Sequence, residues 1–276
     1  MAVRHFGLKG RPAPNHQKQF ELGEFGKASQ AFTIDLTYDR SVRFHTWDKK
    51  NSKKHVTAIQ KALGVIKSVS PDCFELFCRF TRSITPIKQK EFVSYSLQSL
   101  PGHSFINFYN RDDLDLLDDL IHENGHHLLN LFLIQHNPLD ERSAALFYSP
   151  WRETLRPVRG IYHAHCTFFF ALKLYHDLNV ALDSGTLTEI WKLTKKQETK
   201  IRVRYLEEWL MLESSARALS QAAQKKLISP LGVELLNEYE KERKHLGKRV
   251  KATEQKISVT ELKKLSLLEK KLQAHS

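Results

Sequence analysis

The sequence predicts a mainly helical α+β fold, with a small antiparallel sheet in the N-terminal half and a helical hairpin at the C-terminal end. Strand-like alternation of apolar and polar residues is confined to the chain before residue 110, whereas apolar residues at helical spacing dominate after it. The chain has 276 residues, of which 41% are hydrophobic and 27% charged, a globular composition with room for one large or two ordinary domains. A central parallel sheet would contradict this predicted architecture.

Several short elements are expected in the first 110 residues. Residues 1–30 are rich in Gly, Pro, Lys and Gln, which is typical of an irregular arm. Residues 31–47 alternate on both sides of Asp39-Arg40, which favours a hairpin. The apolar spacing and the turn residues then predict helices over 53–69 and 70–80, followed by strands over 83–87, 92–97 and 105–109.

The stretch 112–136 is predicted to form a helix with one buried face and an acidic first turn. It should end before Pro138, because the residue ahead of a proline avoids the α region. Within this stretch stands an H-E-x-x-H motif made of His122, Glu123 and His126. Because residues i and i+4 share a helix face, His122 and His126 can aim their imidazoles at one point and bind a metal ion.

Glu123 lies about 100° round the helix from His122. We expect it to act beside the metal as a catalytic base or an anchor rather than as a ligand. The alternative for the motif is a helix with surface histidines, but the apolar neighbours Ile121 and Leu128 place the pair near the core. A buried histidine pair needs a partner, and a metal ion is one way to provide it.

Residues 148–160 contain Arg152, Arg156 and Arg159 together with two prolines. The prolines stiffen the segment and arginines bind anions through charge-assisted hydrogen bonds, so the stretch predicts an ordered anion-binding loop. The alternative is a surface loop with ordinary ion pairs. A very apolar helix is expected to follow, and His163 and His165 at its start are the candidates for a third metal ligand.

The rest of the chain is expected to be helical. Residues 186–228 are predicted to form one long helix or a helix pair, and residues 231–276 are helical and heavily charged. Ser258 and Glu261 have capping-box spacing, which predicts a helix that starts near Val259.

The predicted organisation is an N-terminal arm over 1–30, a metal-binding catalytic domain over 31–228 and a charged helical tail over 229–276. The tail is expected either to pack as a hairpin or to bind a partner. The formal net charge is +12, from 43 basic and 31 acidic residues, which suggests an anionic partner such as an acidic peptide. No dense Lys and Arg block is interleaved with aromatic residues, so nothing supports dedicated nucleic-acid binding.

The cysteines Cys73, Cys78 and Cys166 are odd in number and lack C-x-x-C spacing. We interpret them as reduced core residues of an intracellular, cytoplasmic protein. The first residues lack the apolar run of a signal peptide, and the most apolar stretch, 166–172, is far too short to cross a bilayer, so no membrane association is expected.

The surroundings of the motif narrow the metal chemistry. The metzincin pattern requires a glycine and a histidine at positions where this chain has leucine and phenylalanine, so that class is excluded. A thermolysin-like zinc peptidase would take a downstream glutamate as third ligand, but neither Glu141 nor Glu153 stands in a clear helical setting. His163 is better placed, because antiparallel packing of the two helices would bring it back to the site. His165 is its competitor.

Five short motifs occur in order over residues 83–182: Leu100-Pro101-Gly102, His122-Glu123-x-x-His126, Tyr148-Ser149-Pro150-Trp151-Arg152, Arg156-Pro157 and Gly160-Ile161-Tyr162-His163. With them the chain resembles the HExxH-motif peptide-modification proteins associated with ribosomally made peptide natural products. Members of that family are understood as iron(II)- and 2-oxoglutarate-dependent peptide hydroxylases that act at β-carbons. The resemblance implies that His122, His126 and His163 bind iron. The Ala164-His165 that follows departs from the Gly common there, which leaves room for His165 to contribute.

The chemistry of the residues fits this implication. Three neutral imidazoles leave positions open for a bidentate 2-oxo acid and dioxygen. The distal carboxylate of 2-oxoglutarate needs a cation, which Arg152, Arg156 or Arg159 can supply. The expected partner is a peptide substrate, with an acidic leader peptide as a further candidate.

Two other classes stay open. The first is a zinc-dependent HExxH metallopeptidase with Glu123 as general base. The second is a non-catalytic metal-bound scaffold whose basic helical tail recruits an acidic partner.

Overall fold

The structure is a computed structural model that describes residues 30–36, 40–46, 51–90 and 92–275. It divides into two compact units, residues 1–130 and 131–276. The predicted N-terminal arm, apart from Gln30, lies outside the described residues. The predicted division into arm, catalytic domain and tail concerns independent folding and remains a prediction.

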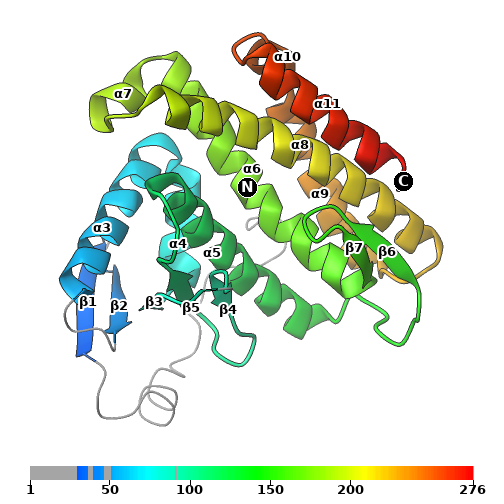
Figure 1. Cartoon of the computed structure of the whole chain (residues 1–276). Helices are drawn as coiled ribbons and strands as arrows, with labels where there is room; N and C mark the ends of the chain where they lie inside the picture. The colour runs from blue at the N-terminus through cyan, green and yellow to red at the C-terminus, as the bar shows by residue number, and fades with distance from the viewer. Residues whose placement is uncertain (1–29, 37–39, 47–50, 91, 276) are drawn as a thin grey trace. The chain divides into compact units, whose positions relative to one another are not determined.

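The first unit contains a five-stranded sheet with the strand order β1-β2-β3-β5-β4 (Figure 1). Its strands are β1 (Gln30–Leu36), β2 (Arg40–Thr46), β3 (Ser83–Ile87), β4 (Tyr95–Ser96) and β5 (His103–Asn107). The outer pairs β1–β2 and β4–β5 are antiparallel, but β2–β3 and β3–β5 are parallel. The predicted class, a mainly helical α+β fold with a small sheet in the N-terminal half, is confirmed. The sheet itself is mixed, so the prediction that it is antiparallel is wrong for its two central pairs.

The connections explain the parallel centre. Parallel neighbours need a crossover of a dozen or more residues, and helices usually provide it. Helices α3 (Ser52–Val69) and α4 (Pro71–Phe80) stand between β2 and β3. This helical crossover allows β2 and β3 to run in the same direction as neighbours.

Helix α5 (Asp113–His136) carries the H-E-x-x-H motif, as predicted. Its buried side includes Leu114, Leu117 and Ile121, none more than 1% exposed. The helix ends where Asn137 takes a positive φ of 37° ahead of Pro138, which confirms the predicted end.

The second unit is helical apart from one hairpin. Its elements are β6 (Leu146–Ser149), β7 (Thr154–Pro157), α6 (Val158–Asp183), α7 (Thr186–Ile190), α8 (Lys195–Gln224), α9 (Pro230–Leu246), η1 (Gly247–Arg249), α10 (Val250–Glu254) and α11 (Val259–Gln273). The stretch 148–160, predicted to be a loop, is thus mostly an antiparallel hairpin followed by the first turn of α6. Each strand has only four residues, so the alternation of apolar and polar residues is too short to indicate a strand in a stretch rich in proline and arginine.

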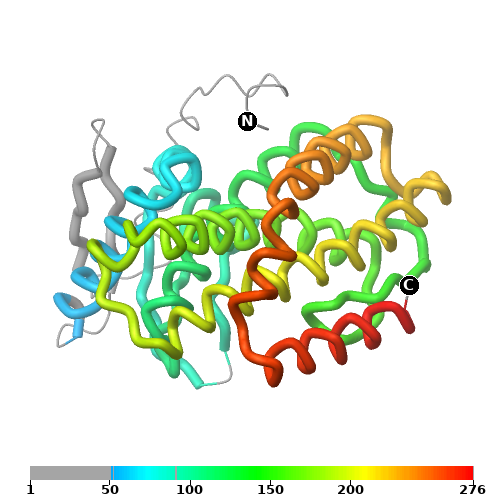
Figure 2. The backbone as a smooth tube through the Cα atoms, turned by 90° about the horizontal axis from the view of Figure 1, so that it is seen from above, coloured from blue at the N-terminus to red at the C-terminus, as the bar shows by residue number. Residues whose placement is uncertain are grey.

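Helices α6 and α8 form the centre of the second unit (Figures 1 and 2). Two fully buried tyrosines anchor later helices to them. The Tyr162 hydroxyl donates to the carbonyl of Gly232 at 3.0 Å, and the Tyr205 hydroxyl donates to that of Leu246 at 2.6 Å. Each buried hydroxyl therefore satisfies a backbone acceptor at an end of α9.

The C-terminal residues are helical, as predicted, and α11 begins at Val259 with the Ser258 hydroxyl as its N-cap. The main partner of α11 is α8 rather than α9. Leu272 is buried with Tyr148 and Met211, and the imidazole of His275 stacks on Tyr148 with ring centroids 4.1 Å apart. The last helix therefore covers the β6–β7 hairpin.

Two further predictions can be compared with the structure. Cys73, Cys78 and Cys166 are all free and buried, which confirms them as core residues. Among the described ranges, every helix is too short or too polar to cross a lipid bilayer.

Candidate metal centre

Three potential metal ligands come together on α5. The candidate donor atoms of His122, Glu123 and His126 all lie within 4.8 Å of one another. The two imidazoles have their ring centroids 4.9 Å apart and are nearly perpendicular, at 82°. Both histidines are half-buried, whereas Glu123 is only 2% exposed. Two imidazoles and one carboxylate are a donor set that suits zinc or iron(II), so this group could hold a metal ion.

Four side-chain hydrogen bonds fix the rotation of α5 against the sheet. They are Ser94 Oγ to Asp119 Oδ2 at 2.6 Å, Ser96 Oγ to Glu123 Oε2 at 2.8 Å, Ser104 Oγ with His127 Nε2 at 2.9 Å and Thr81 Oγ1 to Asn124 Oδ1 at 3.0 Å. Because each bond is directional and at least partly buried, together they resist rotation of the helix about its axis.

This rotation decides where the histidines point. Each helical residue turns the direction of its side chain by about 100°. Going round α5, Asn124 faces the start of β3, His127 faces β5, and Glu123 and Asp119 face β4. His126 and His122 come next in the same sense of rotation. The two imidazoles therefore project from the β4 side of the helix and not over β3 or β5.

Burial governs the protonation of the two acids that face β4. It raises the pKa of Glu123 to about 8; the hydrogen bond from Ser96 lowers it and the nearby Asp119 raises it further. Burial likewise raises the pKa of Asp119 to about 7, against the lowering effects of Ser94 and of Arg111, which lies 3.3 Å away. A cation bound at the histidines would favour the charged form of Glu123.

His127, next to the motif, was not singled out from the sequence. Its Nδ1 accepts the Gly102 N–H at 3.3 Å, so Nε2 carries the proton and donates to Ser104 Oγ. Burial, with smaller contributions from His103 and Arg82, lowers its pKa to about 3. His127 is therefore a neutral histidine that holds α5 on the sheet. In the sequence, the only indication of a role for His127 was that it directly follows His126.

His163 lies on α6 in the second unit, beside two of the predicted arginines. Burial lowers the pKa of His163 to about 4, and the positive charges of Arg159 and Arg156 contribute. Arg159 forms an ion pair with Glu141. The guanidinium of Arg156 lies over Gly160, where an added Cβ would come within 2.9 Å of Arg156 Nε. A side chain at residue 160 would therefore force the Arg156 guanidinium to shift. His163, Arg156 and Arg159 form one basic cluster.

The other predicted residues of this region are placed differently. Arg152 is exposed in the turn between β6 and β7. His165 is 2% exposed, and its Nδ1 lies 2.8 Å from Ser215 Oγ on α8. Because Ser215 donates its own proton to the carbonyl of Leu212, it accepts from His165, so one ring nitrogen is committed to helix packing. The proposed roles of His163 and the arginines toward a metal or cofactor remain predictions.

Trp151 has a structural role that sequence reasoning missed. Its ring stacks on Phe168 at 4.4 Å and 6°, and its Nε1 donates to Glu208 Oε2 at 2.9 Å. Glu208 has no exposed side-chain surface and also pairs with Arg204 at 2.7 Å. The tryptophan therefore fastens the β6–β7 hairpin to α6 and α8.

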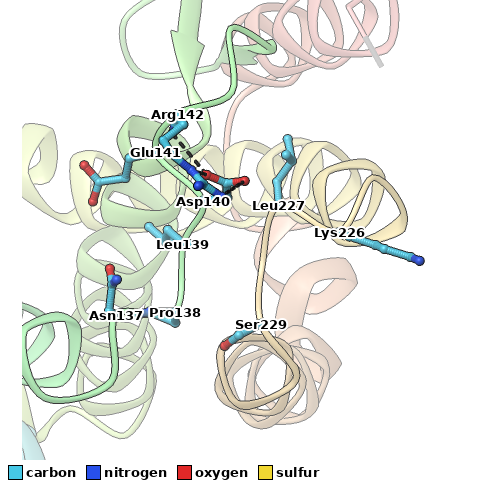
Figure 3. Close-up of a pocket in the computed structure, with 9 residues that line it drawn as sticks. All are labelled: Asn137, Pro138, Leu139, Asp140, Glu141, Arg142, Lys226, Leu227 and Ser229. Atoms are coloured by element: carbon cyan, nitrogen blue, oxygen red, sulfur yellow. Dashed lines mark hydrogen bonds and ion pairs between the residues drawn. The ribbon is translucent and has the colours of Figure 1, made fainter.

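A hollow of about 420 Å³ lies elsewhere in the second unit, where residues 137–142 meet the α8–α9 turn (Figure 3). Backbone hydrogen bonds tie its walls, from Asp140 N to Leu227 O at 3.0 Å and from Ser229 N to Pro138 O at 2.8 Å. None of the predicted histidines lines it, so it is separate from the candidate metal ligands.

No protein-family model matches this chain, and no curated protein has a sequence detectably similar to it.

Proposed function

We propose that this protein is an iron(II)- and 2-oxoglutarate-dependent hydroxylase that modifies a β-carbon of a peptide. The observation that carries the proposal is the group of His122, Glu123 and His126 on a helix whose rotation is fixed by buried hydrogen bonds. The resemblance of the motifs to the HExxH peptide-modification family supports the choice of reaction.

The residues divide the work as follows. His122 and His126 would hold the metal, with His163 as the third ligand. Iron(II), once bound with 2-oxoglutarate and dioxygen, supplies the oxidising power for the C–H bond. The basic cluster of Arg156 and Arg159 would neutralise the distal carboxylate of 2-oxoglutarate, since a guanidinium can pair with it through two hydrogen bonds. Glu123, held by Ser96, would orient water or substrate beside the metal.

A second candidate is a zinc metallopeptidase, and the position of Glu123 favours it. The Glu123 carboxylate lies within 4.8 Å of the donor atoms of both histidines and is nearly fully buried. In a zinc hydrolase this residue accepts the proton of the attacking water, and a pKa raised by burial suits a general base. The same residues thus serve either reaction, and the metal and the cosubstrate distinguish them.

The decisive experiment is anaerobic purification with metal analysis, followed by titration of 2-oxoglutarate. We expect iron in the wild-type protein and loss of metal in His122→Ala and His126→Ala, because a site with too few ligands does not retain iron(II). His163→Ala should weaken metal binding strongly. His136→Ala is the matched control, since His136 is exposed at the end of the same helix.

The outcomes separate the candidates. Iron-loaded protein should show a new visible absorbance on addition of 2-oxoglutarate. Absence of binding at millimolar 2-oxoglutarate would remove the hydroxylase proposal. Zinc retention with peptide hydrolysis that Glu123→Gln abolishes would establish the metallopeptidase. If His165→Ala, rather than His163→Ala, lowers the metal content, the third ligand is His165.

A further inference from the structure

The segment around β4 is both exposed and apolar. In the described part of the first unit, the large hydrophobic side chains that remain exposed are Phe92, Val93 and Leu97, at 60%, 49% and 42%. They lie within six residues, and β4 is an outer strand of the sheet. Proteins usually mask such an edge with charge or proline, so an apolar edge indicates a binding surface.

Hydrogen bonds from Asn107 hold three residues next to β4 in place. The buried side chain of Asn107 donates from Nδ2 to the carbonyls of Phe92 at 2.7 Å and Gln89 at 2.9 Å. The backbone N–H of Asn107 donates to Ser94 Oγ at 2.9 Å. Because the backbone at Gln89 and Phe92 and the side chain of Ser94 are already held by hydrogen bonds, a partner that binds beside them has less conformational entropy to remove.

The same edge runs beside the candidate metal ligands. Ser96 on β4 donates to Glu123, whose carboxylate lies within 4.8 Å of the histidine donor atoms. The rotation of α5 directs His126 and His122 to the β4 side of the helix rather than over β3 or β5. A chain placed along the outer edge of β4 would therefore pass next to the metal group.

We propose that the outer edge of β4 binds an extended peptide as an additional antiparallel strand and so presents it to the metal group. The inference rests on the proposed function in taking a peptide as substrate. Main-chain groups of residues 93–97 would pair with the peptide, and its apolar side chains would contact Phe92, Val93 and Leu97. An added strand fits both candidate reactions, since each needs a peptide backbone held in one register.

The charge at one end of β4 specifies the peptide further. Lys88 and Lys90 are exposed ahead of β4, and with Glu91 the sequence stretch 88–91 carries a net formal charge of +1. In an antiparallel pair, the C-terminal part of the peptide lies at this end. The occupant is therefore an apolar, extended peptide with an acidic residue on the C-terminal side of the modified position.

The first test uses synthetic nonapeptides with Val, Ile, Leu, Phe and Thr varied at the first seven positions and Asp at the last two. They are fluorescently labelled and titrated against the full chain by polarisation, in EDTA and without 2-oxoglutarate. The tightest binder is then N-methylated one residue at a time. A paired strand uses the N–H of alternate residues, so affinity should fall about fivefold or more at every second position only.

The second test uses surface variants. Val93→Asp and Leu97→Asp should each weaken binding about tenfold or more, because a charge replaces an apolar contact. Val259→Asp and Leu267→Asp are matched controls, since these side chains are 68% and 67% exposed on α11. A double Lys88→Glu, Lys90→Glu variant should prefer peptides that end in lysine over those that end in aspartate.

The proposal is wrong if no peptide binds up to ~1 mM, if N-methylation shows no period of two, or if the β4 variants bind as tightly as the controls. It is also wrong if sedimentation shows that β4 pairs with a second copy of the chain and excludes the peptide. Because this binding is measured without metal, it is independent of the chemistry. A bound peptide that is never hydroxylated would sink the proposed reaction and leave the edge site standing.

Discussion

A variant of Trp151 can test whether this residue stabilises the second unit by holding the β6–β7 hairpin on α6 and α8. Trp151→Phe keeps an aromatic ring on Phe168, where the centroids are 4.4 Å apart, but removes the N–H that donates to Glu208 at 2.9 Å. Because Glu208 is fully buried, water cannot replace the lost donor. We expect the variant to be less stable.

The size of the loss follows from the remaining contacts. A hydrogen bond to a charged group contributes about 1.5–3 kcal/mol. The pair with Arg204 at 2.7 Å persists, and Arg204 is 26% exposed, so the carboxylate keeps one partly solvated partner. The free energy of unfolding of the second unit should therefore fall by about 2 kcal/mol, near the middle of that range.

Urea unfolding followed by circular dichroism measures this change. A double-mutant cycle with Glu208→Met, which keeps the length of the side chain but has no acceptor oxygen, isolates the Trp151–Glu208 interaction, and a coupling of about 1 kcal/mol or more is expected for groups in direct contact. A loss below about 0.5 kcal/mol with additive effects would refute the structural role. Trp151 would then be available for contact with a ligand, and its position beside the arginines would need that explanation.

Three further predictions follow from the same reasoning. His127→Phe should lower the free energy of unfolding by about 2–4 kcal/mol, because the Gly102 N–H and the Ser104 hydroxyl lose their buried hydrogen-bond partner. Arg156→Lys should lower it by less. Arg156→Lys should raise the half-saturating 2-oxoglutarate concentration about tenfold without changing metal content. Arg142→Lys, whose side chain is 91% exposed, serves as its control, and equal effects would contradict the assignment to Arg156. Burial tends to raise the pKa of Asp183, but hydrogen bonds and charge from Lys256 and Arg202 lower it overall. Its stabilising effect is thus fully present at neutral pH and declines once the pH falls below the ordinary Asp value of about 3.8 toward the depressed pKa. Asp183→Asn should therefore destabilise at pH 7 and progressively less as the pH is lowered below that value, which a series of thermal unfolding curves can show.

Local patterns in the sequence predicted much of the first unit. Apolar spacing located α3 and α5, and alternation placed β3 at 83–87, where the structure has it. These elements follow from period and turn chemistry alone. Strand direction does not, because it depends on which strands become neighbours after the crossover through α3 and α4.

Local sequence patterns did not predict the β6–β7 hairpin of the second unit or the contacts that hold it. Prolines and arginines in 148–160 suggested a loop, yet Tyr148 and Leu155 are paired across a hairpin. What makes the hairpin stable is Trp151 on α6 and α8, a contact between residues 57 positions apart. Likewise the hydrogen bond between His165 and Ser215 depends on how α6 packs on α8. Contacts of this range leave no periodic signal in the sequence.

In the candidate metal group, residues outside the pair of histidines determine the direction in which the two imidazoles point. His122 and His126 share a face of α5 by their spacing, but the spacing does not decide which way that face looks. Asp119, Glu123 and His127 lie at intervals of four; Glu123 is bonded to β4, His127 to β5, and Asp119 to Ser94 immediately before β4. This row fixes the helix so that the adjacent row, with the two imidazoles, projects from the β4 side of the helix. A peptide site at the edge of β4 and a metal site on the helix are thus consequences of one helix rotation, and variants that loosen this rotation should impair metal binding and peptide binding together.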